Sequence, residues 1–367
     1  MDFSYDDEQK ALRDAVRGLT TKAYGEFEKR RRVTAAAPGF DEDLWGRLAE
    51  MGVLGLPFSE DDGGVGAGPV EMGIVAQELG RVLAPEPFLA SVVHAGGLVA
   101  AVGTPDQRSD LLGRLAAGEI VLAVAQGATA ELADDAWTLS GVADPVVHGA
   151  RADHLVVAAT LPRGGTGLFV VAGDAATRVD YPTFDGGRAA RIELDCTSAV
   201  ALGEPGLDQT AAIDAVRDLT RIIAANQALG VMQSQVAATT GYLKSRKQFG
   251  VTLNTFQALT FRAADMYVSL ELTHSLVDWA TMVAAAGDAA ATTQAADRVG
   301  LQVGRAGQHV GQEAIQLHGG IAMTAEYAVG VGTAHLAALG QWLGGTHHHL
   351  TRLGGRVRDH GEVEALT

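Results

Sequence analysis

The sequence predicts a mainly α-helical protein in which a small β unit separates two helical regions. Apolar residues recur at three- and four-residue spacing over most of the chain, which is typical of amphipathic helices. Between residues 121 and 205, short β-branched runs bounded by Gly, Asp or Pro replace that spacing and favour strands. We therefore expect an N-terminal helical domain at 1–120, a middle β domain at 121–205 and a C-terminal helical-bundle domain at 206–367.

The first 120 residues carry repeated helix signals. Ser4, followed by Asp7 and Glu8, resembles a helix N-cap with acidic residues in the first turn. Pro85 and Pro87 end a preceding helix, because proline lacks the backbone donor that a helix needs. We predict further helices at about 41–51, 69–83 and 88–117.

The middle region is predicted to be a small antiparallel β unit. Three short apolar runs, at 121–125, 155–159 and 168–172, have the length and the boundaries of buried strands. Two further segments, at 137–140 and 191–194, alternate as half-exposed strands do.

Helical periodicity returns at Gln209 and continues close to the C-terminus. We predict helices at about 209–244, 255–286, 289–318 and 333–354. A loop is expected at 245–254, and Gly287-Asp288 has the composition of a helix–helix turn.

Composition and charge argue against several classes of protein. The net charge of −16 is unfavourable for nucleic-acid binding, which needs a basic surface. No apolar run is long enough to span a membrane, and the N-terminus lacks the pattern of a signal peptide. Cys196 is the only cysteine, so we expect no intramolecular disulfide and a cytoplasmic protein. The consecutive His347, His348 and His349 would point about 100° apart on a helix, so we expect no metal site.

Two motifs have the chemistry to hold a phosphorylated cofactor. In Arg246-Lys247-Gln248-Phe249-Gly250, followed by Phe256-Gln257, the guanidinium suits a diphosphate and the aromatic ring suits adenine. In Gln316-x-x-Gly319-Gly320, the two glycines let the backbone approach a phosphate closely. Each motif also has a simpler interpretation: a surface loop with an incidental arginine, and a helix C-cap followed by a turn.

These motifs and the helical–β–helical order resemble the acyl-CoA dehydrogenase family. The resemblance covers essentially the whole chain and is strongest at 2–13, 78–81, 244–257 and 311–346. It implies the acyl-CoA dehydrogenase fold, with a small middle β-barrel or sheet and a C-terminal four-helix bundle, and FAD as the cofactor. In family homotetramers both motifs reach the FAD of the neighbouring subunit. The cofactor-binding residues implied here are Arg246, Gln248, Phe249, Gln257, Gln316, Gly319, Gly320 and Thr346.

The catalytic carboxylate of the family is missing at both positions where members carry it. One position is a Tyr-Glu-Gly-Thr turn, which here reads Leu343-Gly344-Gly345-Thr346. The other directly precedes an arginine early in the helix after the β domain, and here Thr220 precedes Arg221. We therefore predict no catalytic residue in this chain. By the same resemblance Arg221 contacts an acyl-CoA substrate, with a solvated helix arginine as the alternative.

The segments that hold the flavin ring within one subunit also depart from the family pattern. A Thr-Glu-x-x-Ala-Gly-Ser-Asp element is replaced by Val-Ala-Gln-Gly-Ala-Thr-Ala-Glu at 124–131. An aromatic element ending in Thr-Asn is replaced by Pro-Val-Val-His at 145–148. A misalignment of a few residues is the alternative explanation. His348 falls where the family often has a flavin-facing glutamine.

The chain thus resembles the non-catalytic β-type subunit of the heteromeric acyl-CoA dehydrogenases of actinobacterial steroid side-chain degradation. This resemblance implies an α2β2 complex with a homologous catalytic subunit, FAD shared at the subunit interface and electron-transfer flavoprotein as the electron acceptor. Two alternatives stay open at this point. One is a self-sufficient homomeric acyl-CoA dehydrogenase with an unrecognised base, and the other is a flavin-free scaffold or acyl-CoA-binding module.

Overall fold

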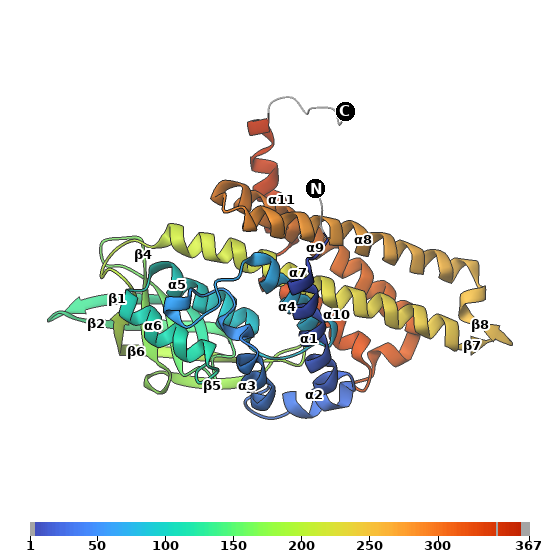
Figure 1. Cartoon of the computed structure of the whole chain (residues 1–367), viewed down its shortest axis with the longest axis horizontal. Helices are drawn as coiled ribbons and strands as arrows, with labels where there is room; N and C mark the ends of the chain where they lie inside the picture. Colours follow the sequence, from blue (N-terminus) through green and yellow to red (C-terminus); the bar gives the residue numbers. More distant parts are fainter. Residues whose placement is uncertain (1–3, 343, 361–367) are drawn as a thin grey trace.

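The computed structural model describes residues 4–342 and 344–360 of the chain. Along the chain, two helical regions precede and follow a β-sheet, which confirms the predicted fold class, and the sheet lies at one end of the molecule (Figure 1). The N-terminal residues 1–3 and Leu343, on which part of the family resemblance rests, lie outside the described residues. No helix in the described ranges is both long and apolar enough to cross a membrane.

The N-terminal region begins with a capped helix whose cap differs from the prediction. Asp6, not Ser4, is the N-cap of α1: its carboxylate accepts from the Gln9 backbone at 2.8 Å, and the Gln9 side chain accepts from the Asp6 backbone at 3.2 Å. The predicted helix at 88–117 is three helices: a π-helix changes to an α-helix at Gly97, and Gly103 with the Thr104 cap interrupts the chain before the third. The helices here are α1 (Asp7–Tyr24), α2 (Phe27–Thr34), α3 (Glu42–Glu50), α4 (Pro69–Arg81), the π-helix η3 (Phe88–Gly96), α5 (Gly97–Val102) and α6 (Pro105–Ala116).

The central sheet has six strands in the order β2-β1-β3-β4-β6-β5. Strand β2 also pairs with β6, so the sheet curls back on itself. The prediction of a purely antiparallel sheet is wrong for one pair, because β1 and β3 run parallel, with Val124 opposite Val156. The strands are β1 (Leu122–Ala133), β2 (Ala136–Val147), β3 (His154–Thr160), β4 (Thr166–Ala172), β5 (Thr177–Pro182) and β6 (Arg188–Ala201).

The C-terminal region is built around one long helix, α7 (Thr210–Ser245). A short hairpin of β7 (Lys247–Gln248) and β8 (Val251–Thr252) follows it, where we had predicted only a loop. The predicted helix at 333–354 is two helices, because Gly344 and Gly345 have φ of +105° and +76° and break it. The remaining helices are α8 (Gln257–Ala285), α9 (Ala289–His318), α10 (Ala328–Trp342) and α11 (Thr346–Gly355).

Helix α7 connects the two ends of the molecule. It begins beside the sheet and ends at the β7–β8 hairpin, which lies at the opposite end from the sheet (Figure 1). Its central residues, including Ile222 and Ile223, are fully buried in the main apolar core. Gly80 of α4 faces the Gln227 carbonyl and Gly230 of α7 faces the Gln77 carbonyl, so the two helix backbones cross in direct contact. This crossing fixes α7 against the N-terminal helices.

Candidate functional site

The predicted site residues fall into two groups that lie far apart along α7. Arg221 lies in the first half of this helix, and Arg246 directly follows its last residue. At the α-helical rise, the 25 residues between them span roughly 37 Å. We call the group near Arg246 the clamp; its residues are Arg246, Gln248, Phe249, Gln257, Gln316, Gly319 and Gly320. We call the group near Arg221 the vacant turn; its residues are Thr220, Arg221, Gly344 and Thr346.

The clamp presents Phe249 at the tip of the β7–β8 hairpin. Phe249 and Gly250 form its two-residue turn, with φ of +55° and +82°. Turns with two positive φ values favour Asn-Gly, and a bulky residue there is strained by about 1–2 kcal/mol. The Phe249 side chain is 92% exposed, so burial in this chain does not compensate the strain. An exposed aromatic ring held in this way is suited to contact another molecule.

An aromatic stack joins the two motifs of the clamp. The His318 ring, in the last turn of α9, lies 4.6 Å from the Tyr242 ring of α7 and 5.1 Å from the Tyr327 ring. Burial lowers the pKa of His318, and its Nδ1 lies 2.8 Å from the Ala314 carbonyl. Gln316, two residues earlier, is exposed, and Gly319 ends the helix with φ of +66°. The stack therefore holds the end of α9 against the end of α7.

The cations and amides of the clamp are available to a ligand. Arg246, Gln248 and Gln257 are all exposed. Within the part of the chain that the structure describes, no carboxylate pairs with Arg246. The Gln248 amide donates only to the neighbouring Lys247 carbonyl, at 2.8 Å. These residues fit the diphosphate and adenine of FAD in chemical type.

The vacant turn has no group that could act as a base. Gly344 and Gly345 donate to the Gln341 and Gly340 carbonyls at 3.0 and 2.9 Å, which closes the end of α10. Thr346 begins α11 and lies against Gly304 of α9, so it belongs to this group and not to the clamp. Thr220 is buried and donates to the Val216 carbonyl at 2.7 Å.

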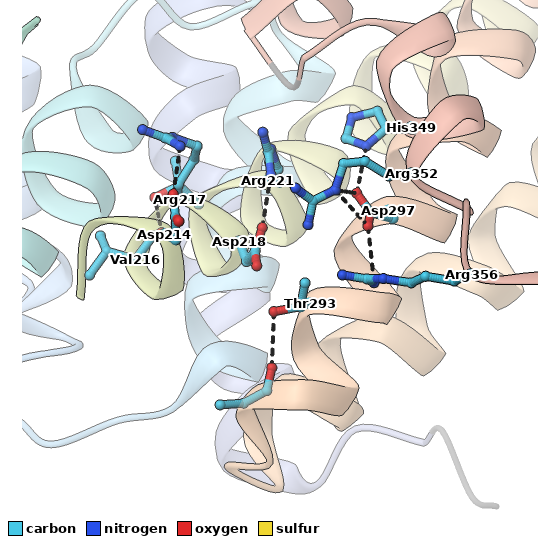
Figure 2. Close-up of polar contacts among 12 residues, drawn as sticks. Asp214, Val216, Arg217, Asp218, Arg221, Thr293, Asp297, His349, Arg352 and Arg356 are labelled. Carbon is cyan, nitrogen blue, oxygen red and sulfur yellow. Dashed lines mark hydrogen bonds and ion pairs between the residues drawn. The ribbon is translucent and has the colours of Figure 1, made fainter. Parts of the chain in front are cut away.

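Arg221 is buried next to this turn and is not a solvated helix arginine. It is 8% exposed, and its Nη1 donates to Asp218 Oδ1 at 2.8 Å (Figure 2). Asp218 is 5% exposed, so the two charges form a buried pair one turn apart. A Cβ built at Gly344 would lie 3.4 Å from Nη2 of Arg221 and 2.9 Å from Cδ2 of His348. A guanidinium thus occupies the surroundings in which the family places its carboxylate.

A single buried carboxylate, which the sequence analysis missed, fixes α11 beside the vacant turn. Asp297 of α9 has no exposed surface and lies 3.1 Å from His349 Nδ1, 2.9 Å from Arg352 Nε and 3.3 Å from Arg356 Nη1 (Figure 2). Burial opposes ionisation of Asp297, but hydrogen bonds from His349 and Arg352 hold its pKa below the usual value. The spacing of 349, 352 and 356 on one helix face was the available signal.

Residues 145–148, one of the two segments expected to hold a flavin ring, do not present a surface for one. Val146 is 1% exposed, and His148, with φ of +57°, packs edge-on against Phe40 at 5.9 Å. Burial lowers the pKa of His148 to about 4. In β1 the register shifts at Gly127, between Gln126 and Ala128. Residues 145–148 offer no exposed aromatic ring that could pack against a flavin.

A small polar cleft lies between the sheet and the start of α7, and residues 126–129 of the other predicted flavin-ring segment line it. Its volume is about 370 Å³. Its hydroxyl groups come from Thr129, Thr160, Thr166 and Thr210. This volume is near the lower limit for small-molecule sites, so the cleft does not replace a full flavin site.

Comparisons with known proteins agree with this architecture. Residues 6–119 match the family described as acyl-CoA dehydrogenase, N-terminal domain, and residues 211–357 match acyl-CoA dehydrogenase, C-terminal domain. The acyl-CoA dehydrogenase IpdE2 of Mycobacterium tuberculosis is 34% identical over 324 residues, 88% of each chain.

Two solved structures share the fold over nearly the whole chain. One is a variant of the steroid ACAD Tcur3481-Tcur3483, with 32% identity, a TM-score of 0.87 and coverage of 96% of this chain and 98% of that chain. The other is the ChsE4-ChsE5 complex from Mycobacterium tuberculosis, with 25% identity, a TM-score of 0.88 and coverage of 100% of each chain.

Proposed function

The chain belongs to the acyl-CoA dehydrogenase family, and on this premise we propose that it is the non-catalytic subunit of a heteromeric, FAD-dependent acyl-CoA dehydrogenase. The observation that supports the proposal is the contrast between the clamp and the vacant turn. The clamp is complete and exposed, whereas the vacant turn has glycine in place of a base and a buried arginine beside it.

The clamp serves a flavin that a neighbouring subunit holds. Arg246 pairs with the diphosphate, Phe249 lies against the adenine, and Gln316 with Gly319 and Gly320 supplies amide contacts. Because the clamp lies roughly 37 Å from the vacant turn, one flavin cannot be held by both groups of the same chain. FAD supplies the hydride acceptor of the reaction, and the neighbouring subunit supplies the base.

Without a base, the chain alone is a poor catalyst. Loss of general-base catalysis costs roughly two to four orders of magnitude in rate. The catalytic partner is a homologous subunit in an α2β2 complex located in the cytoplasm, and electron-transfer flavoprotein accepts the electrons through the complex. The substrate is an acyl-CoA, with a steroid side chain as the acyl group. The relative described as a steroid ACAD supports the steroid substrate, and the relative described as the ChsE4-ChsE5 complex supports a partner subunit.

Helix α8 offers a surface for such a partner. Phe261, Val268 and Leu272 share one helix face and are 59%, 54% and 62% exposed. An apolar stripe of this kind on a water-soluble protein is typical of an interface.

The proposal also keeps the division into 1–120, 121–205 and 206–367, which the separate apolar core inside the sheet supports.

Flavin absorbance after purification tests the proposal against both alternatives. The chain alone is expected to hold little FAD, and its complex with the catalytic partner is expected to hold FAD and oxidise acyl-CoA. Tight stoichiometric FAD and turnover by the chain alone would identify a self-sufficient homomeric enzyme. A complex that binds acyl-CoA but never flavin would identify a flavin-free module.

Arg246→Ala tests the clamp within the complex. A charge-assisted hydrogen bond contributes about 1.5–3 kcal/mol, so flavin should be retained about tenfold or more weakly. Lys247→Ala, which removes the adjacent exposed cation, is the matched control and should retain flavin normally. A change in acyl-group preference at unchanged flavin occupancy would contradict the assignment.

A further inference from the structure

We propose that the vacant turn is a binding pocket for a carboxylate group. The inference goes beyond the proposed function, because it requires neither flavin nor a partner subunit. The pocket lies between α7, the glycines 344 and 345, and the first turn of α11. Arg221 is its recognition residue.

One edge of the Arg221 guanidinium is free to bind. Its Nη1 is taken by Asp218, but its buried Nε has no hydrogen-bond partner. The described residues provide no acceptor for Nη2 either. Nε and Nη2 share an edge of the planar guanidinium, and such an edge binds a carboxylate through two parallel hydrogen bonds. A donor left unpaired in a buried site is costly, so this edge is expected to bind an acceptor.

The backbone around Arg221 adds a second anion-binding element. Helix α11 has ten residues, and no side chain caps its N-terminus at Gly345. Its first backbone amides therefore carry the partial positive charge of a helix N-terminus. Gly344 has no side chain, and Nη2 of Arg221 is 3.4 Å from the position of its missing Cβ. This chemistry suits a small, negatively charged group, and the His348 ring, whose Cδ2 is 2.9 Å from the same position, must move to admit it.

The neighbouring side chains agree with an anionic ligand. Burial lowers the pKa of His348, and the electrostatic influence of the nearby His349, Arg221 and Arg352 lowers it further. His348 is therefore sensitive to a negative charge placed beside Gly344. The His94 ring of η3 packs edge-on at 5.9 Å against Trp342, which lies two residues before Gly344. The His94 Nε2 is buried without a hydrogen-bond partner.

Acetate is the first probe of the full-length chain. Saturation-transfer NMR should detect acetate bound to the wild-type chain, and acetate should raise the melting temperature more than chloride at equal ionic strength. Arg221→Lys keeps the charge next to Asp218 but removes the two-donor edge, so it should weaken acetate binding about tenfold or more. Arg217→Lys is the matched control, because Arg217 pairs with Asp214 in the same spacing one turn earlier and is half-exposed. The control should bind acetate as the wild type does.

A second comparison identifies where the carboxylate comes from. Succinyl-CoA and butyryl-CoA carry four-carbon acyl groups that differ in the terminal carboxylate. Tighter binding of succinyl-CoA that is lost in Arg221→Lys would place the carboxylate on an acyl chain, and equal binding of the two thioesters beside specific acetate binding would identify a free carboxylate. Equal effects of acetate and chloride, or acetate binding by Arg221→Lys at wild-type strength, would overturn the proposal. If Arg221→Lys folds poorly, the charge-neutral pair Arg221→Gln with Asp218→Asn replaces it in the same measurements.

Discussion

Replacing Gly344 with glutamate restores the family's carboxylate at its usual position, yet we expect no recovery of catalysis. The new side chain would begin 3.4 Å from Nη2 of Arg221 and 2.9 Å from Cδ2 of His348, so the His348 ring must shift as the carboxylate meets that guanidinium. An adjacent guanidinium stabilises the ionised form and lowers the pKa of a carboxyl group, which makes it a weaker base. We also expect no flavin ring beside the segment at 145–148, so the new carboxylate would have no hydride acceptor next to it.

The stability of the variants measures this contact. Gly344 has φ of +105°, where any other residue is strained by about 1–2 kcal/mol. Gly344→Gln bears this strain without the charge, so we expect it to be less stable than the wild type by that amount. Gly344→Glu bears the same strain but gains a charge-assisted contact of about 1.5–3 kcal/mol, which should offset the loss.

Two measurements decide the outcome. Denaturant unfolding compares the Glu and Gln variants, and acyl-CoA oxidation is assayed for Gly344→Glu with added FAD. Equal stability of the two variants would show that Arg221 does not reach the new carboxylate. Substantial turnover by Gly344→Glu alone would show that this chain has a working flavin site and that the reasoning about residues 145–148 is wrong.

Three further predictions follow from single side chains. Phe249→Asn suits the hairpin turn better, so the isolated chain should unfold at the same or higher denaturant concentration, while its complex should lose flavin more readily than the wild type. Asp297→Asn should lower the free energy of unfolding by about 1–3 kcal/mol, because hydrogen bonds to a charged group are lost and both arginines are partly exposed. Burial raises the pKa of Glu86 from 4.5 to about 7, so the folded chain holds a proton there that the unfolded chain releases. Stability should therefore fall as pH rises between about 4.5 and 7, by up to about 3 kcal/mol, and Glu86→Gln should flatten that slope in pH-dependent denaturation.

Local signals were sufficient to locate most helices. The Asp41 cap, Pro69 at the start of α4 and the turn at Gly287-Asp288 each act within a few residues, and the structure has helix boundaries at all three. Strand β5 (Thr177–Pro182) was missed because its residues are mostly polar and exposed. The parallel pairing of β1 with β3 depends on chain segments far apart in sequence, which no local pattern specifies.

Contacts between distant parts of the sequence also decide which candidate site residues are buried. Asp214 and Arg217 form an ion pair with the same spacing as Asp218 and Arg221. The second pair lies one turn further along α7. The first pair is largely solvated, whereas the second is buried beside Gly344. Sequence spacing cannot distinguish the two pairs, because only Arg221 lies against the turn at Gly344, which is far away in the sequence. The position of α11 in turn depends on Asp297, a residue in the middle of another helix.

The separation of the clamp from the vacant turn determines how many flavins a complex can hold. Each flavin needs a ring site from one subunit and a clamp from another. Under the proposed function, this chain offers a clamp but no site for a flavin ring, so each pair of unlike subunits can complete one site, built on the partner's ring site. We therefore expect one FAD per pair in the reconstituted complex, measured by flavin absorbance against quantitative amino-acid analysis. Two FAD per pair would mean that this chain also holds a flavin ring. Neutralising the partner's catalytic glutamate should remove almost all activity in either case, because this chain has no base of its own.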